Sequence, residues 1–348
     1  MDVELPPMDV EFPAIYCPFP FKVHPSVERI TQESLAWADQ VGIYPSERYR
    51  QMFHRARFSW WHGVITPDAD EERILPFAKF LLLQGSIPEA WSPHWAGHPG
   101  KLADFVARVG YTLEVPNAKV LTNFPHLMRG WEEVVSQLQK LATPNQYRRW
   151  LECVLSDLNS LVRENWIIAE KKVLDVNEYL PLRMRTMQMT PYFFSNDIVY
   201  GRDVPDYLFD HPAVRALHQL VLVHLGVRND ARDYRRDASE GQCNVIPCLM
   251  RDTGCSETEA IARTVGILDT VMYRCVQLHR RMEKGKMPDA MREHLADVLG
   301  FTRATIAYEQ HVRHGWYQYH GDMSQEFAGS PSSVDPLPYS SVAWCWNV

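Results

Sequence analysis

Apolar residues recur every three or four positions through most of this 348-residue chain. That spacing places them along one face of an α-helix. The pattern occurs in segments 27–44, 72–84, 101–113, 131–142, 146–173, 211–227, 259–283 and 288–316. Strict alternation of apolar and polar residues, which would indicate β-strands, is scarce. The sequence therefore predicts an all-α bundle of roughly ten or more helices.

Residues at the ends of these segments also favour helices. Ser256 lies three positions before Glu259, which is the spacing of a capping box at a helix N-terminus. Pro25 and Pro288 stand near predicted helix starts, where the missing backbone N–H costs nothing. We therefore expect helices to begin close to these residues.

The two ends of the chain differ from its helical middle. Residues 1–25 are Pro-rich and predict an extended N-terminal arm. Residues 328–348, rich in Pro and Ser and ending in aromatic residues, predict an irregular tail that folds back over an apolar surface. No shift in composition divides residues 26–327, so we expect a single helical domain there.

Composition narrows the class of protein. The net charge of −7 argues against a nucleic-acid partner, because phosphate backbones attract basic surfaces. No apolar run reaches the roughly 18 residues of a membrane span, and the acidic N-terminus does not resemble a signal peptide. The seven cysteines are irregularly spaced and lack a zinc pattern, which is typical of reduced thiols. These features predict a cytoplasmic protein; whether it forms a homodimer stays open.

The most informative polar pattern follows the apolar segment 211–227. Asn229, Asp233 and Asp237 are spaced i, i+4 and i+8, which stacks three oxygen-bearing side chains along one stripe of a helix. Mg2+ prefers such oxygen ligands. The alternative is a solvated helix face. The stripe, however, ends a strongly apolar helix and is soon followed by Gly241, which favours a site at the edge of the core.

A second segment, residues 179–191, contains Arg183, which precedes Asn229 by 46 positions. One interpretation is an amphipathic helix that ends before Pro191. The other is a helix that loosens near Met187, so that its main-chain carbonyls face a cavity while Arg183 holds an anion. A metal site and a distant arginine are together suited to binding a diphosphate.

These two segments resemble the microbial class I terpene synthases. That family carries Asn-Asp-x-x-Ser-x-x-(Lys/Arg)-Glu on one helix, matched here by Asn229, Asp233, Arg236 and Asp237. It also carries Tyr-Leu-x-x-Arg-x-x-Thr with a later proline, matched by Tyr179, Leu180, Arg183, Thr186 and Pro191. The likeness extends over most of the chain and to the spacing between the motifs.

The resemblance implies a helical bundle with a central apolar cavity. In that cavity Asn229, Asp233 and Asp237 would bind Mg2+, with Glu89 as a remnant ligand. Arg183 and Arg236 would hold the diphosphate. Thr186 and the carbonyl near Met187 would lie beside the ionising carbon.

The chain departs from the family pattern at three places. The Asp-Asp-x-x-Asp motif falls at Pro88, Glu89 and Ser92, which leaves one carboxylate. The Arg-Tyr pair near the C-terminus falls at 325–326, where glutamine and glutamate stand. Asp233 replaces the usual serine or threonine. Losing one oriented donor typically costs about a hundredfold in rate, so ionisation with this set is a demanding task.

Aromatic rings would stabilise carbocations in such a cavity. At helical spacing most aromatic residues belong to the core, so we weigh both interpretations. The candidates for the cavity wall, chosen for their nearness to the motifs, are Phe80, Phe193, Trp316 and Tyr319.

Three functions remain open. The leading hypothesis is a terpene cyclase that uses Mg2+ to ionise and cyclise a linear prenyl diphosphate, C15 in preference to C20. The alternative keeps the fold but binds or rearranges a terpenoid or prenylated molecule without ionising a diphosphate. The third is a helical interaction protein with no small-molecule activity.

Overall fold

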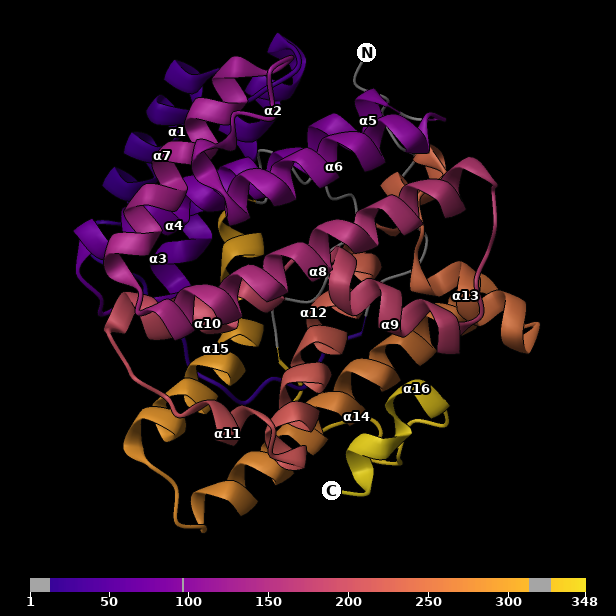
Figure 1. The fold of residues 1–348 in the computed structure, drawn as a ribbon. Helices are drawn as coiled ribbons and strands as arrows, with labels where there is room; N and C mark the ends of the chain where they lie inside the picture. The colour runs from indigo at the N-terminus through magenta and orange to yellow at the C-terminus, as the bar shows by residue number, and fades with distance from the viewer. Residues whose placement is uncertain (1–12, 96, 313–326) are drawn as a thin grey trace.

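A computed structural model describes residues 13–95, 97–312 and 327–348 (Figure 1). In these ranges every regular element is helical, which confirms the all-α prediction. The longer helices are α1 (Val27–Val41), α2 (Glu47–Ala56), α4 (Glu71–Ser86), α6 (Pro99–Glu114), α7 (Pro125–Leu141), α8 (Pro144–Ala169), α9 (Val176–Thr186), α10 (Thr190–Tyr200), α12 (Pro212–Glu240), α13 (Val245–Thr253), α14 (Glu257–Glu283) and α15 (Asp289–His311). Short helices are α3 (His62–Ile65), α5 (Ser92–His94), α11 (Asp206–Phe209) and α16 (Ser340–Ala343), with 3-10 turns at Phe58–Trp61, Pro116–Ala118 and Trp344–Trp346 and a π-helical turn at Ile87–Trp91.

Capping boxes begin two of the longest helices. Ser256 and Glu259 form the predicted box at the start of α14, where the Glu259 N–H donates to Ser256 Oγ over 3.3 Å. Thr143 and Gln146 form a second box at the start of α8. Each box satisfies two backbone donors that have no partner inside the helix, so it determines where the helix begins.

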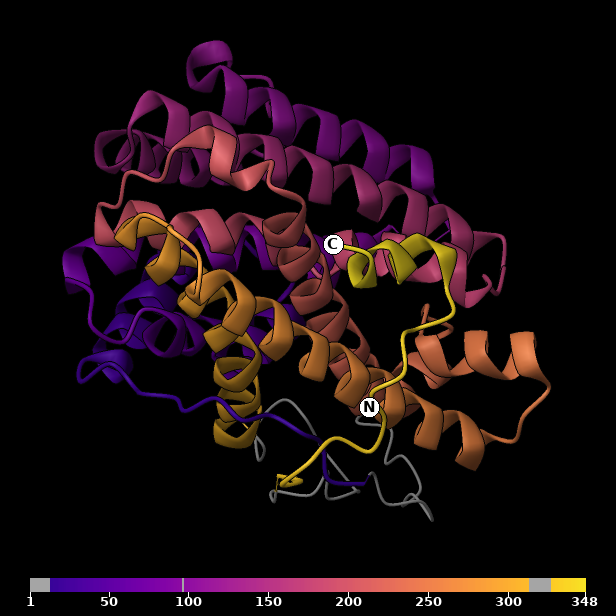
Figure 2. The same ribbon diagram turned by 90° about the horizontal axis from the view of Figure 1, so that it is seen from below.

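Helix α12 occupies the middle of the bundle. It contacts α9, α13, α14 and α15, and both ribbon views place it among the other helices (Figures 1 and 2). Its N-terminal half is apolar and buried, which explains its central position. Its C-terminal half carries the charged stripe, so those side chains reach the edge of the core.

The arm and the tail meet on a buried carboxylate of α14. The backbone N–H of Tyr16 donates to Asp269 Oδ1 over 2.7 Å, and the N–H and hydroxyl of Ser332 donate to Asp269 Oδ2 over 2.7 and 2.6 Å. Beside them the N–H of Ala328 donates to the carbonyl of Ile15. These bonds join two segments that are far apart in the sequence.

The end of the tail is more regular than its composition indicated. Residues Ser340–Ala343 form α16 and Trp344–Trp346 form a 3-10 turn, whereas residues 327–339 are irregular. The reason is tertiary: Asn177 at the start of α9 accepts bonds from Ser340 and Ser341. The division into arm, domain and tail stays a prediction. None of the helices described is long and apolar enough to cross a membrane.

Candidate active site

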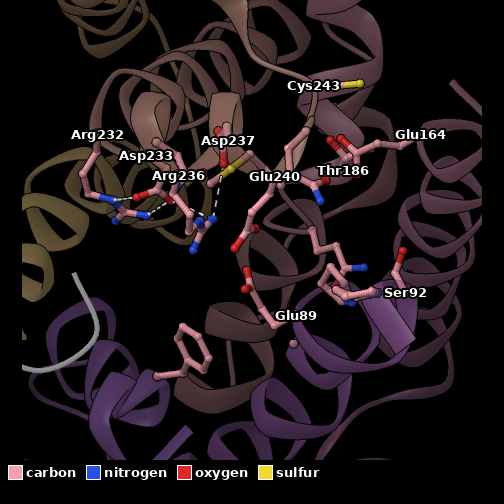
Figure 3. Close-up of a pocket in the computed structure, with 18 of the residues that line it drawn as sticks. Glu89, Ser92, Glu164, Thr186, Arg232, Asp233, Arg236, Asp237, Glu240 and Cys243 are labelled. Atoms are coloured by element: carbon pink, nitrogen blue, oxygen red, sulfur yellow. Dashed lines mark hydrogen bonds and ion pairs between the residues drawn. The ribbon is translucent and has the colours of Figure 1, made fainter. Parts of the chain in front are cut away.

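A cavity of about 930 Å³ opens within the bundle. Its wall is built from α2, α4, the π-helical turn, α8, α9, α12 and α15. Apolar and aromatic side chains form part of this wall, namely Met52, Phe58, Trp61, Leu81, Ile168, Met187, Met189 and Tyr192. Charged side chains from α12 form another part (Figure 3). The cavity therefore has an apolar interior and a charged edge. This arrangement suits a ligand with a hydrocarbon body and an ionic group.

The stripe on α12 lines the charged edge, as its spacing indicated. Asn229, Asp233 and Asp237 all contribute to the wall, and Asn229 Nδ2 donates to Asp233 Oδ2 over 3.3 Å. Arginines already accompany the carboxylates: Arg232 and Arg236 lie 2.8 and 3.2 Å from Asp233 Oδ2 (Figure 3). Arginines of the same helix therefore largely neutralise the acidic stripe.

Burial has a strong effect on Asp237. Its removal from water, together with the nearby carboxylates of Asp233 and Asp230, raises the pKa of Asp237, although Arg236 opposes that shift. Asn244 also donates to Asp237 Oδ2 over 2.9 Å. A cation at this edge would favour the ionised form of the carboxyl group.

Arg183 links α9 to α12 through Asp230. Its Nε lies 2.7 Å from Asp230 Oδ1, and the same guanidinium donates to Asn229 Oδ1. Asp230 is fully buried and also accepts from the Tyr179 hydroxyl over 2.6 Å and from the Val245 N–H over 2.9 Å. Burial acts to lower the pKa of Arg183, but Asp230, Tyr179, Glu164 and Asp237 together outweigh it and raise that pKa. The arginine thus stays charged where it lines the cavity.

One glycine makes room for this arginine. A Cβ atom on Gly226 of α12 would lie 2.8 Å from Arg183 Cγ and 3.4 Å from Met187 Cγ. Carbon atoms normally approach no closer than about 3.5 Å. The two helices can therefore contact at this level only because residue 226 has no side chain.

The predicted break after Arg183 is present. Helix α9 ends at Thr186, Gln188 adopts a left-handed φ of 56°, and α10 begins at Thr190. Thr186 and Met187 both line the cavity. Thr186 accepts from Arg183 Nη1 over 3.5 Å. Burial raises the pKa of Glu164 of α8, while Arg183 and the Thr186 hydroxyl both act to lower it. Arg183, Thr186 and Glu164 therefore form one connected polar group.

The segment that would carry a second acidic motif is a π-helical turn, Ile87–Trp91, a deformation often found at functional sites. Pro88, Glu89 and Ser92 all line the cavity, so the segment has the predicted position. Figure 3 shows Glu89 pointing toward Glu240 of α12. Burial raises the pKa of Glu89, and Arg236 opposes that shift. Across the described chain, no three histidine, cysteine or acidic side chains gather as a metal site.

Two of the predicted aromatic wall residues lie elsewhere. Phe80 packs inside the core against Trp131, Trp150 and Tyr192, and Phe193 packs against Phe301, so neither lines the cavity. Trp316 and Tyr319, and positions 325–326, lie outside the described residues. The aromatic rings on the wall are Tyr49, Phe58, Trp61, Tyr192, Tyr234 and Tyr308.

Several wall residues were missed from the sequence. Glu164 and Asn165 of α8 lie in a long amphipathic helix whose pattern does not distinguish a cavity from solvent. Arg48 and Arg55 of α2 lie seven positions apart and so share a face, but no motif marks them. Asp230 follows Asn229 directly and occupies the Asp position of the Asn-Asp motif, a signal that could have identified it, but its bond to Arg183 appears only in the structure.

Known proteins are similar to this chain over most of its length. Bonnadiene synthase of Allokutzneria albata is 24% identical over 359 residues and the match covers 98% of each chain. A (+)-T-muurolol synthase of Streptomyces clavuligerus, described as (2E,6E)-farnesyl diphosphate cyclizing, is 23% identical over 96% of this chain and 81% of its own. The crystal structure of the SVS_A2 protein from ancestral sequence reconstruction superposes with a TM-score of 0.84 at 24% identity, over 97% of this chain and 99% of that one.

The comparison with family models covers the same motifs. Residues 98–274 match the model described as terpene synthase family 2, C-terminal metal binding. That span includes Arg183 and the stripe from Asn229 to Asp237, and it begins after Glu89. Because the match extends over half of the sequence, this chain belongs to terpene synthase family 2.

Proposed function

We propose that this protein is a terpene cyclase that ionises a linear prenyl diphosphate and cyclises the resulting carbocation. The observation that carries the proposal is the meeting of Arg183 with Asn229 at the charged edge of an otherwise partly apolar cavity. An anionic head group suits the edge, and a hydrocarbon chain suits the interior. Membership in the terpene synthase family supports the same reaction.

The donor set on α12 fits one divalent cation. Asn229, Asp233 and Asp237 offer oxygen atoms at one-turn intervals on the cavity wall, and oxygen is the ligand that Mg2+ prefers. Burial raises the pKa of Asp237 and so disfavours its ionised form, which a bound cation would stabilise. When bound, the cation would withdraw negative charge from the diphosphate. Glu89 is the remaining carboxylate of the opposite segment and would be a remnant ligand.

The protein's own residues would do the rest. Arg183 and Arg236 would hold diphosphate oxygens, since guanidinium groups bind such anions through paired N–H donors. Thr186 and the carbonyl of Met187, at the end of α9, would lie near the carbon that ionises. Trp61 and Tyr192 would face the carbocation with their rings and keep water away from it.

For the substrate we favour C15 over C20. The support is a relative described as cyclising (2E,6E)-farnesyl diphosphate, similar over nearly the whole chain. The cavity volume does not by itself separate the two lengths, because about 930 Å³ lies near the upper end of typical ligand sites.

A second function is favoured by one observation. The opposite segment presents Pro88, Glu89 and Ser92 where three acidic ligands are expected, and the α12 carboxylates are already paired with arginines. A cavity of this kind would suit a terpenoid without diphosphate. Rearrangement would then begin by protonation from Glu89 or Glu164, whose raised pKa values favour the protonated form.

One experiment separates these functions. Purified protein is incubated with Mg2+ and with C10, C15 or C20 prenyl diphosphates, and released diphosphate and volatile products are measured. The proposal requires cyclic product, with release falling at least about a hundredfold in Asn229→Ala and in Arg183→Ala. Absence of release with every chain length would reject the cyclase and favour the diphosphate-independent function.

A further inference from the structure

Helix α2 contributes a second basic surface to the cavity. Arg48, Tyr49, Met52 and Arg55 all line the wall, and their spacing of i, i+1, i+4 and i+7 places them on one face of the helix. The two arginines are exposed along their length, so this face lies at the mouth. None of the family motifs includes it.

The charged groups at the mouth place α2 opposite the end of α12. Burial raises the pKa of Tyr49, Arg48 acts to lower it, and the carboxylate of Glu240 at the end of α12 acts to raise it further. The tyrosine therefore lies within electrostatic range of both helices. An anion at the charged edge of α12 would have the α2 arginines on its other side.

The arginines of α2 differ in whether they form ion pairs with described residues. Arg50, on the same helix, pairs with Asp39 over 2.8 Å and with Glu47 over 3.1 Å. Arg48 and Arg55 have no ion-pair partner within the described part of the chain. Two unpaired positive charges facing a cavity lack a local counterion, which an anionic ligand would supply.

A third arginine faces the same space from α12. Arg235 lines the cavity, and its Nη1 is buried without a hydrogen-bond partner among the described residues. A buried donor without a partner has lost its hydrogen bonds to water and gained none in the protein, which is unfavourable. Arg183, by contrast, already has Asp230, and Arg232 has Asp233 and Glu309. The charge still available to a ligand therefore lies with Arg48, Arg55 and Arg235.

We propose that Arg48 and Arg55 of α2, together with Arg235 of α12, form a second diphosphate-binding surface beside the one made by Arg183 and Arg236. This inference rests on the proposed function. It explains how a segment with Glu89 alone, in place of three acids, would still serve ionisation: guanidinium groups supply positive charge that metal ions would otherwise bring. When the allylic C–O bond breaks, both electrons leave with the diphosphate oxygen, and these arginines stabilise the added negative charge.

The test measures binding of inorganic diphosphate, by isothermal titration calorimetry, to the full chain in the presence of a metal chelator. The wild type is compared with Arg48→Gln, Arg55→Gln and the double variant. The matched control is Arg50→Gln, which removes the same charge from the same helix on its paired side. Because charge-assisted bonds are being removed, we expect the double variant to bind at least about tenfold more weakly. We expect the control to stay within about twofold of the wild type.

Two results would overturn the inference: unchanged affinity in the double variant, or an equal loss in Arg50→Gln, which would indicate only general surface charge. Circular dichroism of each variant confirms that it is folded. Because binding of inorganic diphosphate requires no turnover, failure of the proposed function is seen separately. Metal-free binding that depends on Arg48 and Arg55, without product from any prenyl diphosphate, would reject the cyclase and keep the site.

Discussion

Gly226 offers a direct way to move Arg183 without changing any charge. In Gly226→Ala the new methyl group would lie 2.8 Å from Arg183 Cγ, so the arginine side chain must shift. Because Arg183 lies at the cavity edge and bonds to Asn229, a small displacement there changes how the diphosphate would be held. The substitution thus tests whether the position of the Arg183 guanidinium matters, because the guanidinium itself is kept.

The expected magnitudes differ for stability and for activity. Alanine in a helix interior is favoured over glycine by about 1 kcal/mol. Overpacking against Arg183 and Met187 costs about 1–3 kcal/mol. The free energy of unfolding should therefore fall by only about 0–2 kcal/mol. A misplacement of about 1 Å at a reacting group typically costs a hundredfold in rate, so kcat/KM for diphosphate release should fall by about that factor.

Urea denaturation measures the first quantity and a diphosphate-release assay the second. The control is Gly266→Ala in α14, where a Cβ atom meets nothing within 4 Å. That variant should gain up to about 1 kcal/mol and keep the wild-type rate. Wild-type release by a folded Gly226→Ala protein would refute the reasoning, because Arg183 would then not need the space. A loss of stability above about 4 kcal/mol would refute the packing part of it.

Three further outcomes follow from buried charges and bonds. Asp230→Asn should lower the free energy of unfolding by about 3–5 kcal/mol in urea denaturation, because the Arg183 guanidinium loses its buried counterion; a loss under about 1 kcal/mol would contradict that pairing. Burial lowers the pKa values of His62 and His224 to about 3, so the unfolded chain takes up protons first on acidification, and stability is lost as the pH falls below about 6.5. Between pH 7.5 and 5.5 these two histidines should together lower the free energy of unfolding by about 3 kcal/mol. His62→Phe should remove about half of that loss. Asp269→Ala removes three hydrogen bonds that the arm and the tail donate to this carboxylate. Backbone amides of both segments should then exchange with deuterium at least about tenfold faster. Unchanged exchange would show that other contacts hold both segments.

Local patterns in the sequence predicted the helices well because their signals are local. Ser256 and Glu259 lie three positions apart, so their capping box can be read directly from the chain. Asn229, Asp233 and Asp237 share a face because a helix repeats every 3.6 residues. The expectation that Arg183 lies beside this stripe depends on the spacing between two family motifs. Helix geometry alone does not predict that contact.

What the sequence could not resolve is the neighbour of each buried side chain. The sequence predicts Phe80 and Phe193 for the cavity wall, but both pack against rings of other helices. An apolar periodicity predicts that a side chain is buried, but not whether it faces the core or a cavity. The same limit hid Glu164 on α8. The role of Asp230 depends on a contact with α9, and such contacts between distant segments appear only once the bundle is assembled.

The internal ion pairs of α12 also bear on how a reaction cycle would finish. Arg236 pairs with Asp233 and Asp237, so under the proposed function a departing diphosphate would leave the guanidinium with two carboxylate partners on its own helix. Under the proposed function, such a return would favour release of the product and would weaken the first binding of the substrate. The pairing on α12 would then oppose retention of the inorganic product at Arg236.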